Sequence, residues 1–158
     1  MSKLSRTGFW ILLSGALILA LSLGTRHGFG LFLAPMSAEF GWGRETFAFA
    51  IALQNLIWGI AQPFTGAIAD RFGAMRTVVV GGILYAIGLV LMGYADSAFS
   101  LSMSAGLLIG IGLSGTSFSV ILGAVGRAVP LEQRSMAMGI SAAAGSFGQF
   151  AMLPGTLG

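Results

Sequence analysis

Five long apolar segments, separated by short hydrophilic ones, account for most of this chain of 158 residues. They cover residues 7–38, 46–69, 77–95, 97–126 and 135–158. A helix needs about 20 apolar residues to cross the hydrocarbon core of a bilayer, and only helices pair all their backbone polar groups within one segment. The sequence therefore predicts an all-α polytopic membrane helix bundle of about five transmembrane helices. The first and fourth segments are longer than a crossing needs, so we expect tilt or kinks in them.

The composition excludes several other classes of protein. Charged residues make up 8% of the chain and hydrophobic residues 56%, whereas soluble domains carry about 25% charged residues. There is no cysteine and one histidine, His27, which leaves too few ligands for a metal site, and we expect no cofactor. The basic residues are few and scattered, so nucleic acid is not an expected partner. The expected partner is the lipid bilayer.

The basic residues also predict an orientation. If the five segments cross the membrane alternately, one side holds six bases and the other holds only Arg44. The six are Lys3, Arg6, Arg71, Arg76, Arg127 and Arg134. Because bases concentrate in cytoplasmic loops, we expect a cytoplasmic N-terminus in a multi-pass protein, most simply of a bacterial inner membrane. A cleaved signal peptide fits less well, since the first apolar stretch is long and four more follow it.

The densest polar sequence lies between the second and third segments. Two glycines seven residues apart favour a sharp turn there, and the charges between and beside them belong at the water boundary. The residues are Gly66, Asp70, Arg71, Gly73 and Arg76. They resemble the signature loop of the major facilitator superfamily, Gly-x-x-x-Asp-Arg-x-Gly-x-(Arg/Lys)-(Arg/Lys), which joins that family's second and third helices. Met75 departs from the pattern, because a base is usual there.

The resemblance implies a secondary active transporter that works by alternating access on a small solute. Such transporters have twelve helices in two halves, each half built from inverted three-helix repeats. Residues 1–158 would then be a partial N-terminal half, truncated one helix short and lacking the C-terminal half. By the same resemblance, the loop residues act as a conformational switch in which Asp70 and Arg134 meet. Alternatively, these charges serve only topology, since exposed ion pairs contribute little.

Arg26 is the residue that most suggests a binding site. It follows the charge-free run of residues 7–25, and ionisable residues within membrane segments are usually functional. Ser22 and Phe29 share its helical face. The stretch of residues 26–32 resembles first helices of monocarboxylate and oxalate/formate-type transporters, in which a base precedes a Phe-Gly-x-Phe element. That resemblance implies a small organic anion such as a carboxylate, which a guanidinium binds in a bidentate fork. The alternative is an arginine that extends to the outer headgroups.

Other polar residues give weaker signals. Asn55 and Gln62 lie on one face of the second segment, where they line a substrate path or bond neighbouring helices. Thr116 and Ser119, on one face of the fourth segment, are further candidates for substrate contact. His27 either exchanges a coupling proton or packs at the interface. A coupling proton and a counter-substrate are therefore both candidate partners.

A stripe of small residues in the fourth segment predicts close helix packing. Gly106, Gly110 and Ser114 recur every four residues, as in pairs of membrane helices whose backbones approach closely. A phosphate-binding loop is excluded, because no lysine follows and the segment is apolar.

Transport of a small organic anion is thus the leading interpretation, and others remain open. A drug or metabolite efflux antiporter is less favoured, since no acidic residue lies inside an apolar segment. A truncated membrane protein that does not transport, or an assembly subunit, is the second class. An enzyme is disfavoured, because the five acidic residues are scattered in loops.

Overall fold

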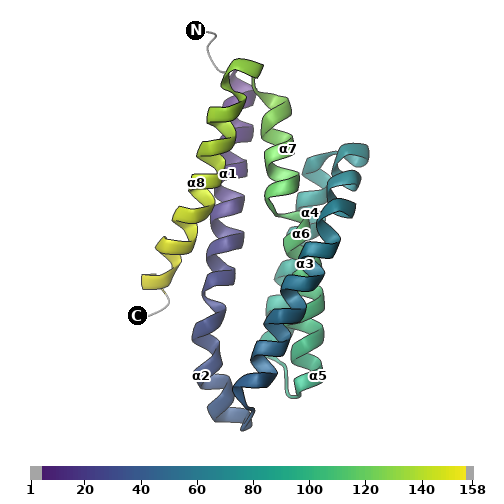
Figure 1. The fold of residues 1–158 in the computed structure, drawn as a ribbon, viewed down its shortest axis with the longest axis vertical. Helices are drawn as coiled ribbons and strands as arrows, with labels where there is room; N and C mark the ends of the chain where they lie inside the picture. The colour runs from purple at the N-terminus through teal and green to yellow at the C-terminus, as the bar shows by residue number, and fades with distance from the viewer. Residues whose placement is uncertain (1–4, 156–158) are drawn as a thin grey trace. The chain divides into compact units, whose positions relative to one another are not determined.

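The computed structural model describes residues 5–155, apart from the side chains at positions 32, 33 and 153–155. Every regular element in this range is helical, which confirms the predicted all-α class (Figure 1). The elements are α1 (Arg6–His27), α2 (Phe29–Phe40), α3 (Arg44–Phe72), α4 (Ala74–Gly93), α5 (Ala98–Leu101), the π-helical turn η1 (Ser102–Leu108), α6 (Ile109–Gly115), α7 (Phe118–Ala128) and α8 (Leu131–Gly155).

Four stretches of the described chain are long and apolar enough to cross a membrane. They are Arg6–Leu31, Arg44–Phe72, Ala74–Gly93 and Ala98–Ala128. Large apolar side chains on them, including Phe64, Ile83 and Val90, are exposed, as expected of surfaces that contact lipid. The fifth predicted segment forms α8, which has 25 residues but is not among these four stretches. That α8 crosses the membrane remains a prediction.

The two longest predicted segments are interrupted, as expected from their length. In the first, α1 ends at His27 and α2 begins at Phe29, with Gly28 between them in a helix-like conformation. In the fourth, α6 ends at Gly115 and α7 begins at Phe118. Ser117 is extended there, with φ −90° and ψ 177°, so the helical hydrogen-bond ladder stops between α6 and α7.

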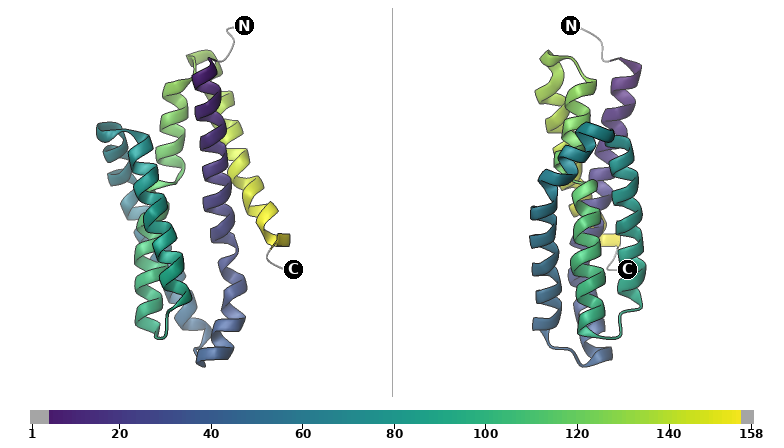
Figure 2. Two further views of the ribbon diagram at one scale, coloured as in Figure 1. Left: turned by 180° about the vertical axis from the view of Figure 1, so that it is seen from behind. Right: turned by 90° about the vertical axis from the view of Figure 1, so that its right-hand side faces the viewer.

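The chain divides into two compact units. The first unit holds the chain up to Phe29 and from Ser117 onward, and the second holds Gly30–Thr116. In the first unit, α1 lies alongside α8 and also packs on α7 (Figure 2). A Cβ added to Gly148 of α8 would overlap the backbone of Ala20, and one added to Gly24 would lie 2.7 Å from the Gly148 carbonyl oxygen. These helices therefore pack backbone against backbone.

In the second unit, η1 and α6 pack against both α3 and α4. Glycines allow both approaches. A Cβ added to Gly110 would lie 3.0 Å from the Gln54 carbonyl oxygen of α3, and one added to Gly112 would lie 2.6 Å from the Tyr85 nitrogen of α4. The predicted small-residue stripe is therefore confirmed as a packing surface, because Gly106 likewise faces Leu53 of α3.

Candidate functional site

The turn between α3 and α4 is formed by a single residue, Gly73. It ends α3 and begins α4, with φ 97° and ψ 137°, a conformation that favours glycine. Its nitrogen donates to the Ala69 carbonyl at 3.0 Å, and its own carbonyl accepts from the Thr77 hydroxyl at 3.2 Å. The predicted sharp reversal is confirmed. The expectation that Gly66 helps to form it is wrong, because Gly66 lies inside α3 and a Cβ there would meet nothing within 4 Å.

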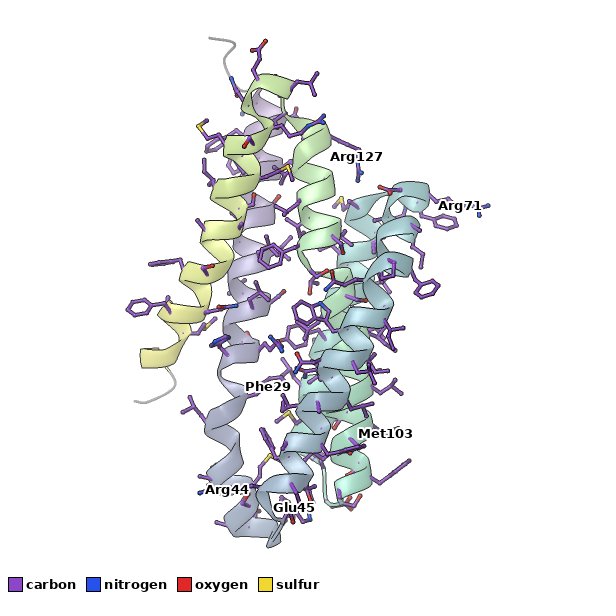
Figure 3. The ribbon with its side chains drawn as sticks, in the orientation of Figure 1. Phe29, Arg44, Glu45, Arg71, Met103 and Arg127 are labelled. Atoms are coloured by element: carbon purple, nitrogen blue, oxygen red, sulfur yellow. The ribbon has the colours of Figure 1, made fainter. Side chains whose placement is uncertain are left out.

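The charged residues of this loop lie at the ends of helices. Asp70, Arg71 and Arg76 are exposed, and the Arg71 guanidinium carbon lies 5.4 Å from the centre of the Phe72 ring. Arg71 marks one end of α3, and Arg44 and Glu45 mark the other (Figure 3). A helix of 29 residues is about 43 Å long at 1.5 Å per residue, so its charged ends can both lie outside a core of about 30 Å.

Arg134, the other residue of the predicted switch, belongs to the first unit. Its Nε donates to the Gly126 carbonyl at 2.7 Å. Gly126 lies in the last turn of α7, where carbonyls lack helical partners and a positive charge is favoured. Arg134 thus links α7 to α8. Its pairing with Asp70, which lies in the second unit, remains a prediction.

Arg26 lies in the last turn of α1, next to His27. The arginine is half-buried and the histidine exposed. Ser22, one turn earlier, is buried. Phe29, the first residue of α2 and labelled in Figure 3, is also buried. A positive charge at this position is favoured by the helix dipole of α1. The structure therefore brings Ser22 and Arg26 onto adjacent turns of one helix, with Phe29 in the same unit.

The predicted amides lie in α3, in the second unit. Asn55 is exposed and its Nδ2 donates to the Ile51 carbonyl of its own helix at 2.9 Å, while Gln62 is half-buried. Gln54 is not among the predicted site residues, yet it is fully buried and its Nε2 donates to the Ala105 carbonyl of η1 at 2.7 Å. Its spacing from Phe47 and Ala50, the other buried residues of that face, could have identified it.

Thr116 and Ser119 do not belong to one continuous helix. Thr116 follows the end of α6 and is buried, whereas Ser119 lies in α7, is exposed and has its hydroxyl 3.1 Å from that of Ser117. The expectation that both lie on one helical face is wrong, because the chain is extended between them. Their contact with substrate remains a prediction, as does that of Asn55 and Gln62. Within residues 5–155, no group of three or more His, Cys, Asp or Glu side chains could hold a metal ion.

Comparison with known proteins matches residues 12–157 to the Major Facilitator Superfamily. Monocarboxylate transporter 13 of Bos taurus is 30% identical over 147 residues, which are 93% of this chain and 34% of that protein. The uncharacterized MFS-type transporter YhjX of Escherichia coli (strain K12) is 31% identical over 102 residues, 65% of this chain and 25% of its own length. Multidrug resistance protein MdtH of Proteus mirabilis (strain HI4320) is 34% identical over 96 residues, 61% and 23% of the two chains. The chain spans about a quarter to a third of the length of these relatives.

Proposed function

Because the chain belongs to the major facilitator superfamily, we propose that it is part of a secondary active transporter for a small organic anion such as a carboxylate. The family consists of membrane transporters rather than enzymes, and the protein is an integral, multi-pass membrane protein. Transport would follow alternating access, with the solute bound between two halves of the longer protein. The coupling partner would be a proton or a counter-substrate.

The position of Arg26 is the main observation that supports an anionic substrate. Arg26 is half-buried at the end of α1, one turn from Ser22. A guanidinium binds a carboxylate through two parallel hydrogen bonds, and such charge-assisted bonds are among the strongest that side chains make. The relatives named monocarboxylate transporters agree with this choice. In this proposal, Phe29, Asn55, Gln62, Thr116 and Ser119 line the rest of the path.

Drug efflux is the second candidate, since one relative is named a multidrug resistance protein. The placement of acidic residues in the described chain favours the anion. Asp70 and Glu45 lie at the two ends of α3, and Asp96 lies between α4 and α5, rather than in the middle of a membrane helix. The proposed orientation puts the N-terminus and the α3–α4 turn in the cytoplasm, in a bacterial inner membrane.

Replacement of Arg26 tests the proposal. In vesicles that contain the protein at the full length its gene encodes, Arg26→Ala should reduce carboxylate uptake roughly tenfold or more, because a charge-assisted hydrogen bond is lost. Arg26→Lys should fall between wild type and Arg26→Ala, since it keeps the charge but not the fork. Arg44→Ala is the matched control. Arg44 is the first residue of α3 and is not among the proposed substrate contacts, so this variant should transport normally. Normal uptake by Arg26→Ala at equal membrane levels would contradict the proposal.

For the α3–α4 loop, we propose a role as a conformational switch that involves Gly66, Asp70, Arg71, Gly73, Arg76 and Arg134. By the family resemblance, Asp70 would lie against the positive end of a helix from the other half of the transporter. A carboxylate there contributes about 0.3–2 kcal/mol, which shifts a two-state equilibrium several-fold. Asp70→Asn should therefore slow transport several-fold, leave substrate affinity nearly unchanged and favour the inward-open state.

Residues 1–158 contain no cysteine, so a single cysteine introduced there, with any cysteine elsewhere in the protein replaced, can report which face is open. Asp96→Asn, an exposed carboxylate between α4 and α5, is the control. If Asp70→Asn transports at the wild-type rate with unchanged labelling of both faces, the loop is a topological turn only.

A further inference from the structure

An apolar groove of about 420 Å³ runs along the second unit beside the α3–α4 turn. Its walls come from three helices of that unit. The large apolar side chains along it are Ile68 and Phe72 of α3, Val80 and Leu84 of α4, and Ile111 of α6. The groove is open on one side, so a long, flexible hydrocarbon chain could lie in it without any rearrangement of the helices.

The two hydroxyls along the groove are already hydrogen-bonded. The Thr65 hydroxyl lies 3.1 Å from the Ala61 carbonyl oxygen and 3.2 Å from that of Ser114. The Thr77 hydroxyl donates to the Gly73 carbonyl at 3.2 Å. Because these groups already have partners within the protein, the walls present hydrocarbon to an occupant. A polar solute would gain no hydrogen bond along most of the groove.

Positive charge is concentrated at the end of the groove near Gly73. Of the residues described along the groove, Arg76 is the one with a formal charge, and it lies in the first turn of α4. The guanidinium of Arg71 lies against the Phe72 ring, which forms part of the wall. Asp70 is two residues from Ile68, about 200° around α3, and so lies off the face that lines the groove.

We propose that this groove binds an anionic phospholipid, with one acyl chain along its apolar walls and the phosphate at Arg76. The chemistry of the groove favours this occupant, because its walls are hydrocarbon and one of its ends carries the positive charge of Arg76. An apolar helix of the same protein would cover the walls but leave Arg76 without an anion. A free phosphate or carboxylate would bind Arg76 but leave the walls empty.

The head-group half of the proposal predicts lipid selectivity. The protein, at the full length its gene encodes, is purified in detergent and its bound lipids are counted by native mass spectrometry. The probes are phosphatidylglycerol and phosphatidylcholine with identical acyl chains. Wild type should prefer phosphatidylglycerol about fivefold, the effect expected of one arginine beside an anionic head group. Arg76→Gln should abolish this preference. Arg127→Gln, an exposed arginine in the last turn of α7, should keep it.

The acyl-chain half is tested by two neighbouring valines of α4. Val79 and Val80 are 50% and 57% exposed, but only Val80 is among the residues that line the groove. Val80→Phe should fill the groove and lower retention of both lipids, while Val79→Phe should retain them as wild type does. The proposal is overturned if Arg76→Gln keeps the preference, if Val79→Phe and Val80→Phe behave alike, or if wild type retains neither lipid because another helix covers the groove. None of these readouts depends on transport.

Discussion

The two units of the molecule hold their helices together in different ways. In the first unit, α1 and α8 meet backbone against backbone through Gly24 and Gly148. In the second, α4 and α6 meet in the same manner at Gly81 and Gly115, where a Cβ added to Gly81 would lie 2.8 Å from the Gly115 Cα. The second unit also holds a fully buried side chain that bonds another helix, since the Gln54 amide donates to η1, whereas an interhelical bond of the first unit, from Arg134 of α8 to α7, is only partly buried.

This difference shows two solutions to one problem. Lipid is as apolar as leucine, so membrane helices associate through close packing and interhelical hydrogen bonds rather than through the hydrophobic effect. The α1–α8 contact relies on shape, because glycine lets the two backbones touch. The α3–η1 contact combines shape with a hydrogen bond to a π-helical turn, a deformation that leaves an α-helix locally irregular. The first contact should be sensitive to added volume and the second to loss of a polar group.

The largest expected effect is that of Gly148→Ala. The added Cβ would overlap the Ala20 backbone, which cannot move aside as a side chain could, so we expect a loss of stability of about 1–3 kcal/mol or more. Gly139→Ala is the control in the same helix, because a Cβ there meets nothing within 4 Å. Unfolding in mixed detergent micelles measures both. Equal stability of the two variants would show that α1 and α8 are not in backbone contact.

A smaller effect is expected of Gln54→Leu. The substitution removes the bond to the Ala105 carbonyl and leaves that buried oxygen without this donor, which should lower stability by about 1 kcal/mol. Asn55→Leu is the matched control, because the Asn55 amide donates to a carbonyl on the exposed side of its own helix. This substitution should lower stability by less than about 0.5 kcal/mol. If Asn55→Leu lowers stability as much as Gln54→Leu does, the bond from Gln54 to η1 contributes no specific stability to the second unit.

Much of the fold could be predicted from the sequence because membrane constraints are strong. Long apolar segments predicted the helices, and the spacing of charges predicted where the chain turns. The single-residue turn at Gly73 was predictable because few other residues adopt its conformation. Gly66 was misinterpreted because a glycine inside a helix and a glycine in a turn look alike in sequence.

The interruptions of the fourth segment were harder to place. Ser102 and Ser104 donate to the carbonyls four residues earlier, at 2.8 Å each, and such bonds compete with the regular helical ladder. Hydrophobic periodicity does not detect such bonds, so neither η1 nor the break at Thr116 and Ser117 was located. The predicted shared face of Thr116 and Ser119 failed for that reason.

Sequence could also identify which residue types belong in a site, but not their partners. Arg26 was selected from its position after an apolar run, and Arg134 from the resemblance to the family's signature loop. The bond from Arg134 to the Gly126 carbonyl depends on how α7 and α8 turn through Pro130, which no local pattern specifies. The role of Gln54 likewise depends on η1 lying beside α3.

The orientation of α4 is decisive, because α4 should cross the membrane with the Gly73 turn in the cytoplasm. Met75 and Tyr94, at the two ends of α4, are each 82% exposed. Residues 1–158 contain no cysteine, so single Met75→Cys and Tyr94→Cys variants, with any cysteine elsewhere in the protein replaced, are treated with a membrane-impermeant maleimide from each side. We predict that Met75→Cys is labelled only from the cytoplasmic side and Tyr94→Cys only from the opposite side. Labelling of both variants from the same side would contradict this prediction.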